Sequence, residues 1–129
     1  MPEIPPGTDP NQYPPLVLAY IGDAVYELMV RTHILTSGHR RLRSMHLEAV
    51  EMVKAENQAR FVRQIMEELS PEERDMVRRG RNSRSTPPKN ADLQAYRMST
   101  GFEALLGYLY ITGNHERLRY VVNRAWGDA

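Results

Sequence analysis

The chain of 129 residues contains no cysteine, few aromatic residues and no long apolar run. Without cysteine it can form neither a disulfide nor a thiolate metal site. No stretch approaches the roughly 20 apolar residues that a membrane-spanning helix needs. The amino terminus also lacks the basic and apolar segments of a signal peptide. We therefore expect a cytoplasmic protein with no membrane partner.

Proline is concentrated at the amino terminus, where residues 1–15 hold six of the nine prolines. Proline does not fit the interior of a helix, so we expect residues 1–15 to form an extended, proline-rich arm. Residues 16–129 are numerous enough to build one hydrophobic core, and they contain no internal repeat. We expect them to form a single domain.

Apolar residues recur at helical spacing through most of this domain, and no strand pattern is present. Ser70-Pro71-Glu72-Glu73 has the sequence of a capping box with proline at the first helical position. The predicted fold class is all-α. We expect helices over residues 15–36, 44–69 with one break near 53–55, 71–80, 91–112 and 115–126.

Two acidic residues lie within otherwise apolar helical segments. Asp23 and Glu27 are the only charged side chains in residues 16–30, and Glu103 is the only one in residues 102–112. Both segments are apolar nearly all the way round, so we expect Asp23 and Glu103 to be largely buried. A buried carboxylate is costly unless it is paired, hydrogen-bonded or bound to a metal ion.

The two acids suggest a site that is shared between two helices. Gly22 and Gly101 lie close to them, which indicates that two backbones approach each other there. Two adjacent carboxylates repel unless a proton or a divalent cation lies between them, and oxygen ligands suit Mg²⁺ or Mn²⁺. The alternative is that a buried arginine or tyrosine satisfies each acid separately. The four histidines lack ligand-pair spacing, so zinc is not expected.

The net charge is only +1, but the basic residues are clustered. Residues 78–89 contain five basic side chains and no acid, and a second basic cluster covers residues 39–43. Such patches indicate a polyanion bound at one face, although many charged loops are only solvated. Beside a carboxylate-held cation, a basic loop suits phosphodiester cleavage, because the cation activates water and the loop holds the flanking phosphates.

The residues around both acids resemble two motifs of the ribonuclease III family. Tyr20-Ile21-Gly22-Asp23 is similar to the end of the family's signature helix, and Phe102-Glu103-Ala104-Leu105 is similar to its second motif. The closer resemblance is to the short Mini-ribonuclease III branch, which lacks a double-stranded-RNA-binding domain. It extends through residues 79–82, 88–90 and 96–100 and covers about residues 16–123.

This resemblance implies the helical fold of the ribonuclease III endonuclease domain, with residues 16–129 as the catalytic domain. It implies that Asp23 and Glu103 are the catalytic and metal-binding residues and hold Mg²⁺, with Mn²⁺ as a substitute. It also implies a homodimer with Tyr20 at the interface, which cleaves double-stranded RNA during maturation of large-subunit (23S) ribosomal RNA. We expect RNA contacts from Arg78, Arg79, Arg81, Arg84, Lys89 and Asn90.

The chain also departs from the full-length enzymes of the family, whose further acids are replaced here by Leu16, Ala19 and Thr100. Two carboxylates favour one firmly held ion, with water and RNA phosphate completing its shell. We read Glu27 as the ion-pair partner of a basic neighbour, with an outer metal ligand as the alternative. The alternative function is a non-catalytic RNA-binding module in ribosome assembly, but such a module has no need for both acids.

Overall fold

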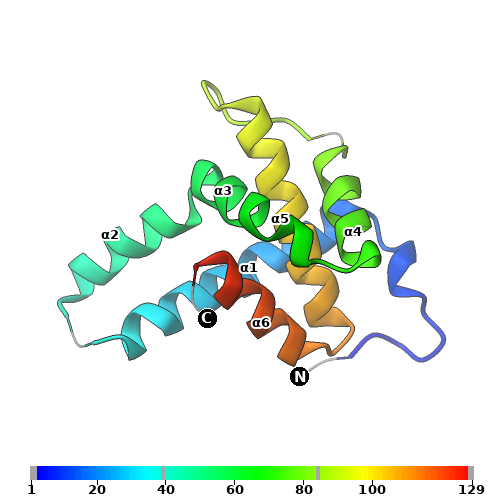
Figure 1. Ribbon diagram of the computed structural model, residues 1–129, viewed down its shortest axis with the longest axis horizontal. Coiled ribbons are helices and arrows are strands. Elements are labelled where there is room, and N and C mark those ends of the chain that lie inside the picture. The colour runs from blue at the N-terminus through cyan, green and yellow to red at the C-terminus, as the bar shows by residue number, and fades with distance from the viewer. Residues whose placement is uncertain (1–2, 39, 84, 128–129) are drawn as a thin grey trace.

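The computed structural model describes residues 3–38, 40–83 and 85–127 (Figure 1). All regular structure in these residues is helical, which confirms the all-α fold class. The elements, in chain order, are η1 (Pro10–Gln12), α1 (Pro15–Thr36), α2 (Leu42–Val53), α3 (Ala55–Ile65), η2 (Met66–Glu68), α4 (Pro71–Arg81), α5 (Leu93–Ile111) and α6 (His115–Ala125).

Helix α5 is the centre of the molecule and packs against α1, α3, α4 and α6. Figure 1 shows α1 passing across α5, while the end of α1 and the start of α2 extend together to one side. The largest fully buried side chains, among them Tyr26 of α1 and Phe102 of α5, belong to the core between these helices. The crossing of α1 and α5 therefore lies at the core.

Glycines let the central helices approach unusually closely. A Cβ atom added to Gly22 would lie 1.7 Å from the carbonyl oxygen of Glu103, and one on Gly107 would lie 1.9 Å from that of Leu18. On the other side of α5, a Cβ on Gly101 would lie 2.5 Å from the carbonyl oxygen of Val77 in α4. The expected close approach of backbones beside both acids is confirmed.

Local signals set the helix ends. The Ser70 hydroxyl accepts from the backbone N–H of Glu73, whose carboxylate accepts from the backbone N–H of Ser70, as the capping-box sequence predicts. Helix α5 begins at Leu93, two residues later than expected, because the Asp92 carboxylate caps its first turn. Lys54 has an extended backbone, with φ −59° and ψ 143°, and it forms the expected break between α2 and α3.

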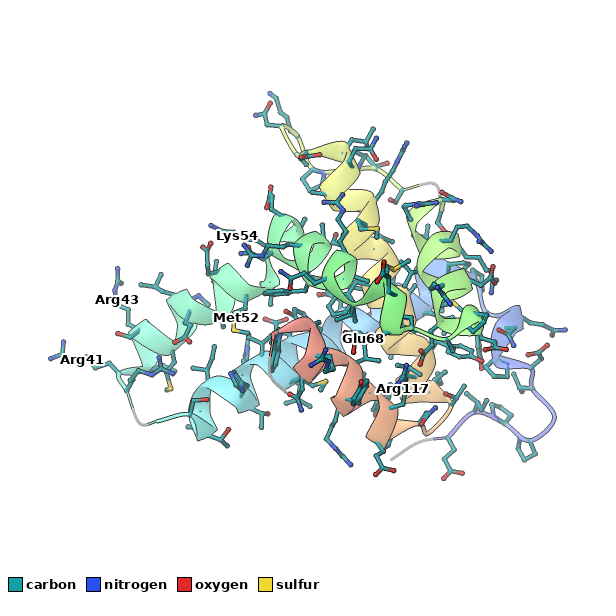
Figure 2. The ribbon with its side chains drawn as sticks, viewed as in Figure 1. Arg41, Arg43, Met52, Lys54, Glu68 and Arg117 are labelled. Atoms are coloured by element: carbon teal, nitrogen blue, oxygen red, sulfur yellow. The ribbon has the colours of Figure 1, made fainter. Side chains whose placement is uncertain are left out.

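An ion-pair cluster fastens α6 to the preceding elements. Arg117 Nε and Nη2 each donate to one oxygen of the buried Glu73 carboxylate at 2.8 Å, and this pairing lowers the pKa of Glu73. Arg117 also donates to the carbonyl oxygen of Glu68 at 3.0 Å, and Arg124 pairs with the Glu68 carboxylate at 2.9 Å. Figure 2 shows Glu68 and Arg117 near each other. Helix α6 is thereby held against α4 and η2.

Before α1, the described chain forms one short helix, η1, in an otherwise non-helical segment. Tyr13 packs against the core, and the Arg79 side chain donates to the carbonyl oxygen of Asn11 at 3.3 Å. These contacts lay the amino-terminal segment against the body of the protein.

Across the described ranges, no helix combines the length and apolar character that crossing a bilayer requires.

Candidate active site

The structure brings Asp23 and Glu103 together where α1 crosses α5. The two residues are 80 positions apart in the sequence, yet Gly22 lies against the backbone of Glu103 and the neighbouring Asp23 raises the pKa of Glu103. The contact depends on Gly22, because any larger residue there would push α1 away from the backbone of Glu103. The fold therefore places the two acids beside each other, and a shared site remains a prediction.

Their burial differs from what the sequence suggested. Asp23 is exposed, so the expectation of two largely buried acids was wrong for Asp23, whereas Glu103 is mostly enclosed. Helix α1 packs one face against α5, including Leu18, Gly22 and Tyr26, and Asp23 lies beside that face rather than in it. The site is therefore accessible to solvent on the side of Asp23.

The electrostatics of the pair leave Glu103 protonated near neutral pH. Burial and, after it, the negative charge of Asp23 and the hydrogen bond between the two acids raise the pKa of Glu103 to about 8. A hydrogen bond from the Gln58 side chain acts in the opposite direction. Two carboxyl groups that share one proton are a pair whose proton a divalent cation can replace.

The donor set fits a hard divalent cation. In the described part of the chain, neither Asp23 nor Glu103 has a salt bridge to a basic residue, so no arginine neutralises them as the alternative supposed. Among the described residues, no group of three or more His, Cys, Asp or Glu side chains is placed to hold a metal ion. The protein thus supplies two carboxylates, and water and substrate oxygens would complete the coordination of Mg²⁺ or Mn²⁺.

Two buried side chains that the sequence analysis did not single out border this pair, and both bind the end of α2. The Tyr26 hydroxyl donates to the carbonyl oxygen of Met52 at 3.1 Å, and Gln58 Nε2 donates to that of Val53 at 2.8 Å. Such carbonyls lack partners at a helix end. Figure 2 labels Met52 and Lys54 at this junction. The break between α2 and α3 is thereby tied to α1 and to the site.

Gln58 could have been found from the sequence. It lies three and seven residues before Phe61 and Ile65, so a polar residue occupies a position on the apolar stripe of α3. The structure places its side chain in the core, with 3% exposure. The polar residue on an apolar stripe was the sequence signal for Gln58. Its hydrogen-bond partner, the carbonyl oxygen of Val53, could be identified only from the structure.

Glu27 lies one turn beyond Asp23 and pairs with Arg31 at 2.7 Å on the surface of α1. This confirms the reading of Glu27 as the partner of a basic neighbour. Its carboxylate is directed to that ion pair and leaves the site to Asp23 and Glu103.

The predicted RNA-binding residues lie at the end of α4 and in the loop before α5. Arg78 pairs with Asp75, and Arg81 Nε donates to the side-chain oxygen of Asn82 at 3.3 Å. Arg79 contacts the amino-terminal segment, as described above. Each of these three arginines therefore has a protein partner, and Arg78 and Arg81 are nevertheless exposed.

The rest of the loop is accessible to solvent. Lys89 and Asn90 are exposed, and Asn90 has a positive φ of 66°, which fits a turn just before α5. Arg84 lies outside the described residues. Glu103 lies ten residues into α5, so the start of that helix is roughly 15 Å away along its axis.

Helix α1 exposes a broad apolar face on the described chain. Tyr20 is 79% exposed and Leu28 67%, and Val17 and Leu35 are exposed as well. Beside Leu28 lies a hollow of about 700 Å³ whose walls come from α1, the end of α5 and α6. Some apolar residues of α1 thus pack in the core, and the others lie on an exposed face.

The chain has clear relatives among known proteins. A family model described as Ribonuclease III domain matches residues 16–114. A Mini-ribonuclease 3 from Thermoanaerobacter sp. is 54% identical over 84% of this chain and 77% of its own length. Another from Symbiobacterium thermophilum is 47% identical over 91% of both chains. A crystal structure of a Fusobacterium nucleatum protein has a TM-score of 0.83 at 26% identity and covers 90% of this chain and 96% of that one.

Proposed function

The chain belongs to the ribonuclease III family and is an endoribonuclease, and from this premise we propose that Asp23 and Glu103 are its catalytic, metal-binding residues. The single observation that carries the proposal is the pair of neighbouring carboxyl groups at the close crossing of α1 and α5. The proposed cation is Mg²⁺, for which Mn²⁺ can substitute, because both prefer oxygen ligands.

The residues of the site have distinct tasks in RNA hydrolysis. When bound, the cation supplies an activated water and neutralises charge on the scissile phosphate. Asp23 reaches the site from α1 and Glu103 from α5, so the glycine-mediated crossing fixes the separation of the two ligands. Because Asp23 is exposed, the outer side of the site stays open for the phosphate.

The family acts on double-stranded RNA, and we propose that the end of α4 and the following loop hold its backbone. A-form RNA is recognised mostly through shape, phosphates and 2′-hydroxyls. The proposed contact residues are Arg78, Arg79, Arg81, Lys89 and Asn90, together with Arg84. Arg81 and Lys89 carry most of this proposal, because both are exposed and neither has an acidic partner among the described residues.

We also propose that the protein is a homodimer. A small domain seldom leaves side chains such as Tyr20 and Leu28 exposed on one helix face without a partner. The hollow beside Leu28 offers an apolar place for the ring of Tyr20 from the partner subunit, which is the interface role that the family resemblance gives to this aromatic residue. One dimer would then bring two sites to the two strands of a duplex.

The proposed substrate is the precursor of large-subunit (23S) ribosomal RNA, processed in the cytoplasm. This part rests on the resemblance to the short Mini-ribonuclease III branch. The competing function, a non-catalytic RNA-binding module, is disfavoured by the paired acids, since a pair that raises the pKa of Glu103 to about 8 gives a pure RNA binder no benefit.

Incubation of the protein with long double-stranded RNA tests the proposed activity. Cleavage into shorter duplexes is expected with Mg²⁺ or Mn²⁺, and EDTA should stop it. Single-stranded RNA of the same sequence is the control and should remain largely intact. Binding of the duplex without any cleavage in Mg²⁺ or Mn²⁺ would instead support the RNA-binding module.

A further inference from the structure

The side chain of Gln58 is buried beside the proposed catalytic pair. It belongs to the first turns of α3, is 3% exposed and shares the buried face of that helix with Val62 and Ile65. A buried amide is costly unless it is hydrogen-bonded, so an apolar residue would be the simpler choice at this position. Its presence in the core calls for a role that apolar packing does not supply.

The Gln58 amide is hydrogen-bonded to the end of α2 and also acts on Glu103. Gln58 Nε2 donates to the carbonyl oxygen of Val53 at 2.8 Å, and that carbonyl is available because α2 ends at Val53. The same amide also acts on the Glu103 carboxyl group, because the Gln58 side chain lowers the pKa of Glu103. The break between α2 and α3 therefore sets the direction from which Glu103 is approached.

The other atom of the amide has no such partner. Gln58 Oε1 is buried and has no hydrogen-bond partner. Among the described residues it is the one buried side-chain nitrogen or oxygen atom in this state. Buried acceptors are nearly always satisfied, so an unsatisfied one beside a site for a hydrated cation indicates a missing donor. Water in the shell of a divalent cation is a suitable donor, and outer-shell hydrogen bonds of this kind orient metal ligands.

We propose that Gln58 is a positioning residue of the active site, which holds the Glu103 carboxylate in place from α3 and accepts a hydrogen bond from cation-bound water through Oε1. The inference rests on the proposed function of Asp23 and Glu103. It adds a third helix to the site and makes the junction at Lys54 part of the catalytic architecture.

The alternative is that Gln58 only ties the end of α2 to α3. A variant of the neighbouring Asn57 can distinguish this structural role from the positioning role. Asn57 Nδ2 donates to the carbonyl oxygen of Glu51 at 2.6 Å, so Asn57 ties the same junction. Asn57 is partly exposed, and it is not among the side chains that shift the pKa of Glu103. Asn57→Ala is therefore the matched control for a purely structural role.

Mn²⁺ binding by the protein alone, measured calorimetrically without RNA, is the direct test. Gln58→Met keeps the length of the side chain but removes its donors and acceptor, and it should weaken Mn²⁺ binding by about tenfold or more. Its kcat on double-stranded RNA should fall while KM stays within about twofold, because Gln58 does not lie at the proposed RNA surface. Asn57→Ala should keep the Mn²⁺ affinity of the parent.

Gln58→Asn guards against misfolding of the first variant, since its shorter amide cannot reach both Val53 and Glu103. Parent-like Mn²⁺ affinity in either folded Gln58 variant, or an equal loss in Asn57→Ala, would overturn the positioning role. Asp23→Asn tells the two proposals apart. If it loses Mn²⁺ binding while the Gln58 variants retain it, only the role of Gln58 fails, whereas if it also binds like the parent, the proposed metal site itself fails.

Discussion

At the scale of single residues, the proposed function depends on two neighbouring carboxyl groups, those of Asp23 and Glu103. Asp23 is exposed and retains access to water, whereas Glu103 is mostly enclosed and carries the proton of the pair near neutral pH. The metal-free protein is therefore strained electrostatically at the place where catalysis is proposed. Relief of this unfavourable arrangement is what would give the proposed site its affinity for a cation.

The raised pKa of Glu103 predicts an unusual dependence of stability on pH. Because the folded-state pKa, about 8, exceeds the ordinary value of 4.5, the folded protein binds more protons than the unfolded chain between these values. The contribution is fully present below about pH 4.5 and is lost as the pH rises through about 8, for a total of a few kcal/mol. In EDTA, the melting temperature should therefore fall over this window.

Glu103→Gln is the control for this effect, because a glutamine does not titrate. The difference in melting temperature between the variant and the parent should widen as the pH rises, and Mg²⁺ should stabilise the parent most at the alkaline end. Parallel pH profiles of the two proteins in EDTA would contradict the assignment of a shared proton to the pair.

At the scale of elements, the site depends on the crossing of α1 and α5. Gly22 and Gly107 allow each helix to touch the backbone of the other, and this contact sets the position of Asp23 relative to Glu103. Gln58 of α3 binds the end of α2 at Val53 and lowers the pKa of Glu103. The same few residues, Gly22 and Gly107 among them, therefore determine both the helix packing and the geometry of the site.

Gly22→Ala tests this dependence. The added methyl group would overlap the carbonyl oxygen of Glu103, so α1 and α5 must move apart. The free energy of unfolding, measured by urea denaturation, should drop by about 1–3 kcal/mol or more, and RNA cleavage should fall further than the stability loss explains. Gln64→Ala, on the exposed side of α3, should change stability by less than about 0.5 kcal/mol. A Gly22→Ala protein as stable and active as the parent would refute the close crossing.

Most helix boundaries could be predicted from the sequence because local signals set them. The proline before α1, the Ser70 capping box and the Asp92 cap act within one turn, and Lys54 lies at the expected break. The contact between Asp23 and Glu103 could be predicted from the motif resemblance. The exposure of Asp23 could not, because an apolar helix has the same pattern whether one of its faces meets the core or is left uncovered.

At the scale of the whole molecule, a single chain exposes two surfaces of distinct character. The exposed face of α1 around Tyr20 is apolar, and the surface at the end of α4 is basic. An apolar face favours another protein surface, and a basic one favours phosphate. The proposed homodimer and the proposed RNA surface account for these two features separately.

Tyr20→Ala should weaken the proposed dimer without unfolding the subunit, because Tyr20 is 79% exposed on the single chain. Removing an aromatic ring that fills a pocket in the partner typically costs about 3 kcal/mol or more. Sedimentation should show a dimer for the parent at micromolar concentration and a shift toward monomer for the variant. A parent protein that sediments as a monomer would remove the basis for this prediction.

The basic surface should carry much of the affinity for RNA. Replacing Arg81 and Lys89 together by alanine should raise the dissociation constant for double-stranded RNA and flatten its salt dependence by about one unit of slope per lost phosphate contact. The comparison is Arg63→Ala with Arg74→Ala, two exposed arginines elsewhere on α3 and α4. If both double variants bind with the same affinity and salt slope, the loop does not contact RNA, and the basic residues 40–43 become the next candidates.

Cleavage of long double-stranded RNA by Glu103→Gln in saturating Mg²⁺, alongside a binding measurement, tests the central claim most directly. Glutamine keeps the shape of the side chain but cannot supply the second carboxylate, so cleavage should be lost while folding and RNA binding stay close to those of the parent. Near-normal turnover by this variant would contradict the account, because the pair at the crossing of α1 and α5 would then not be the catalytic site.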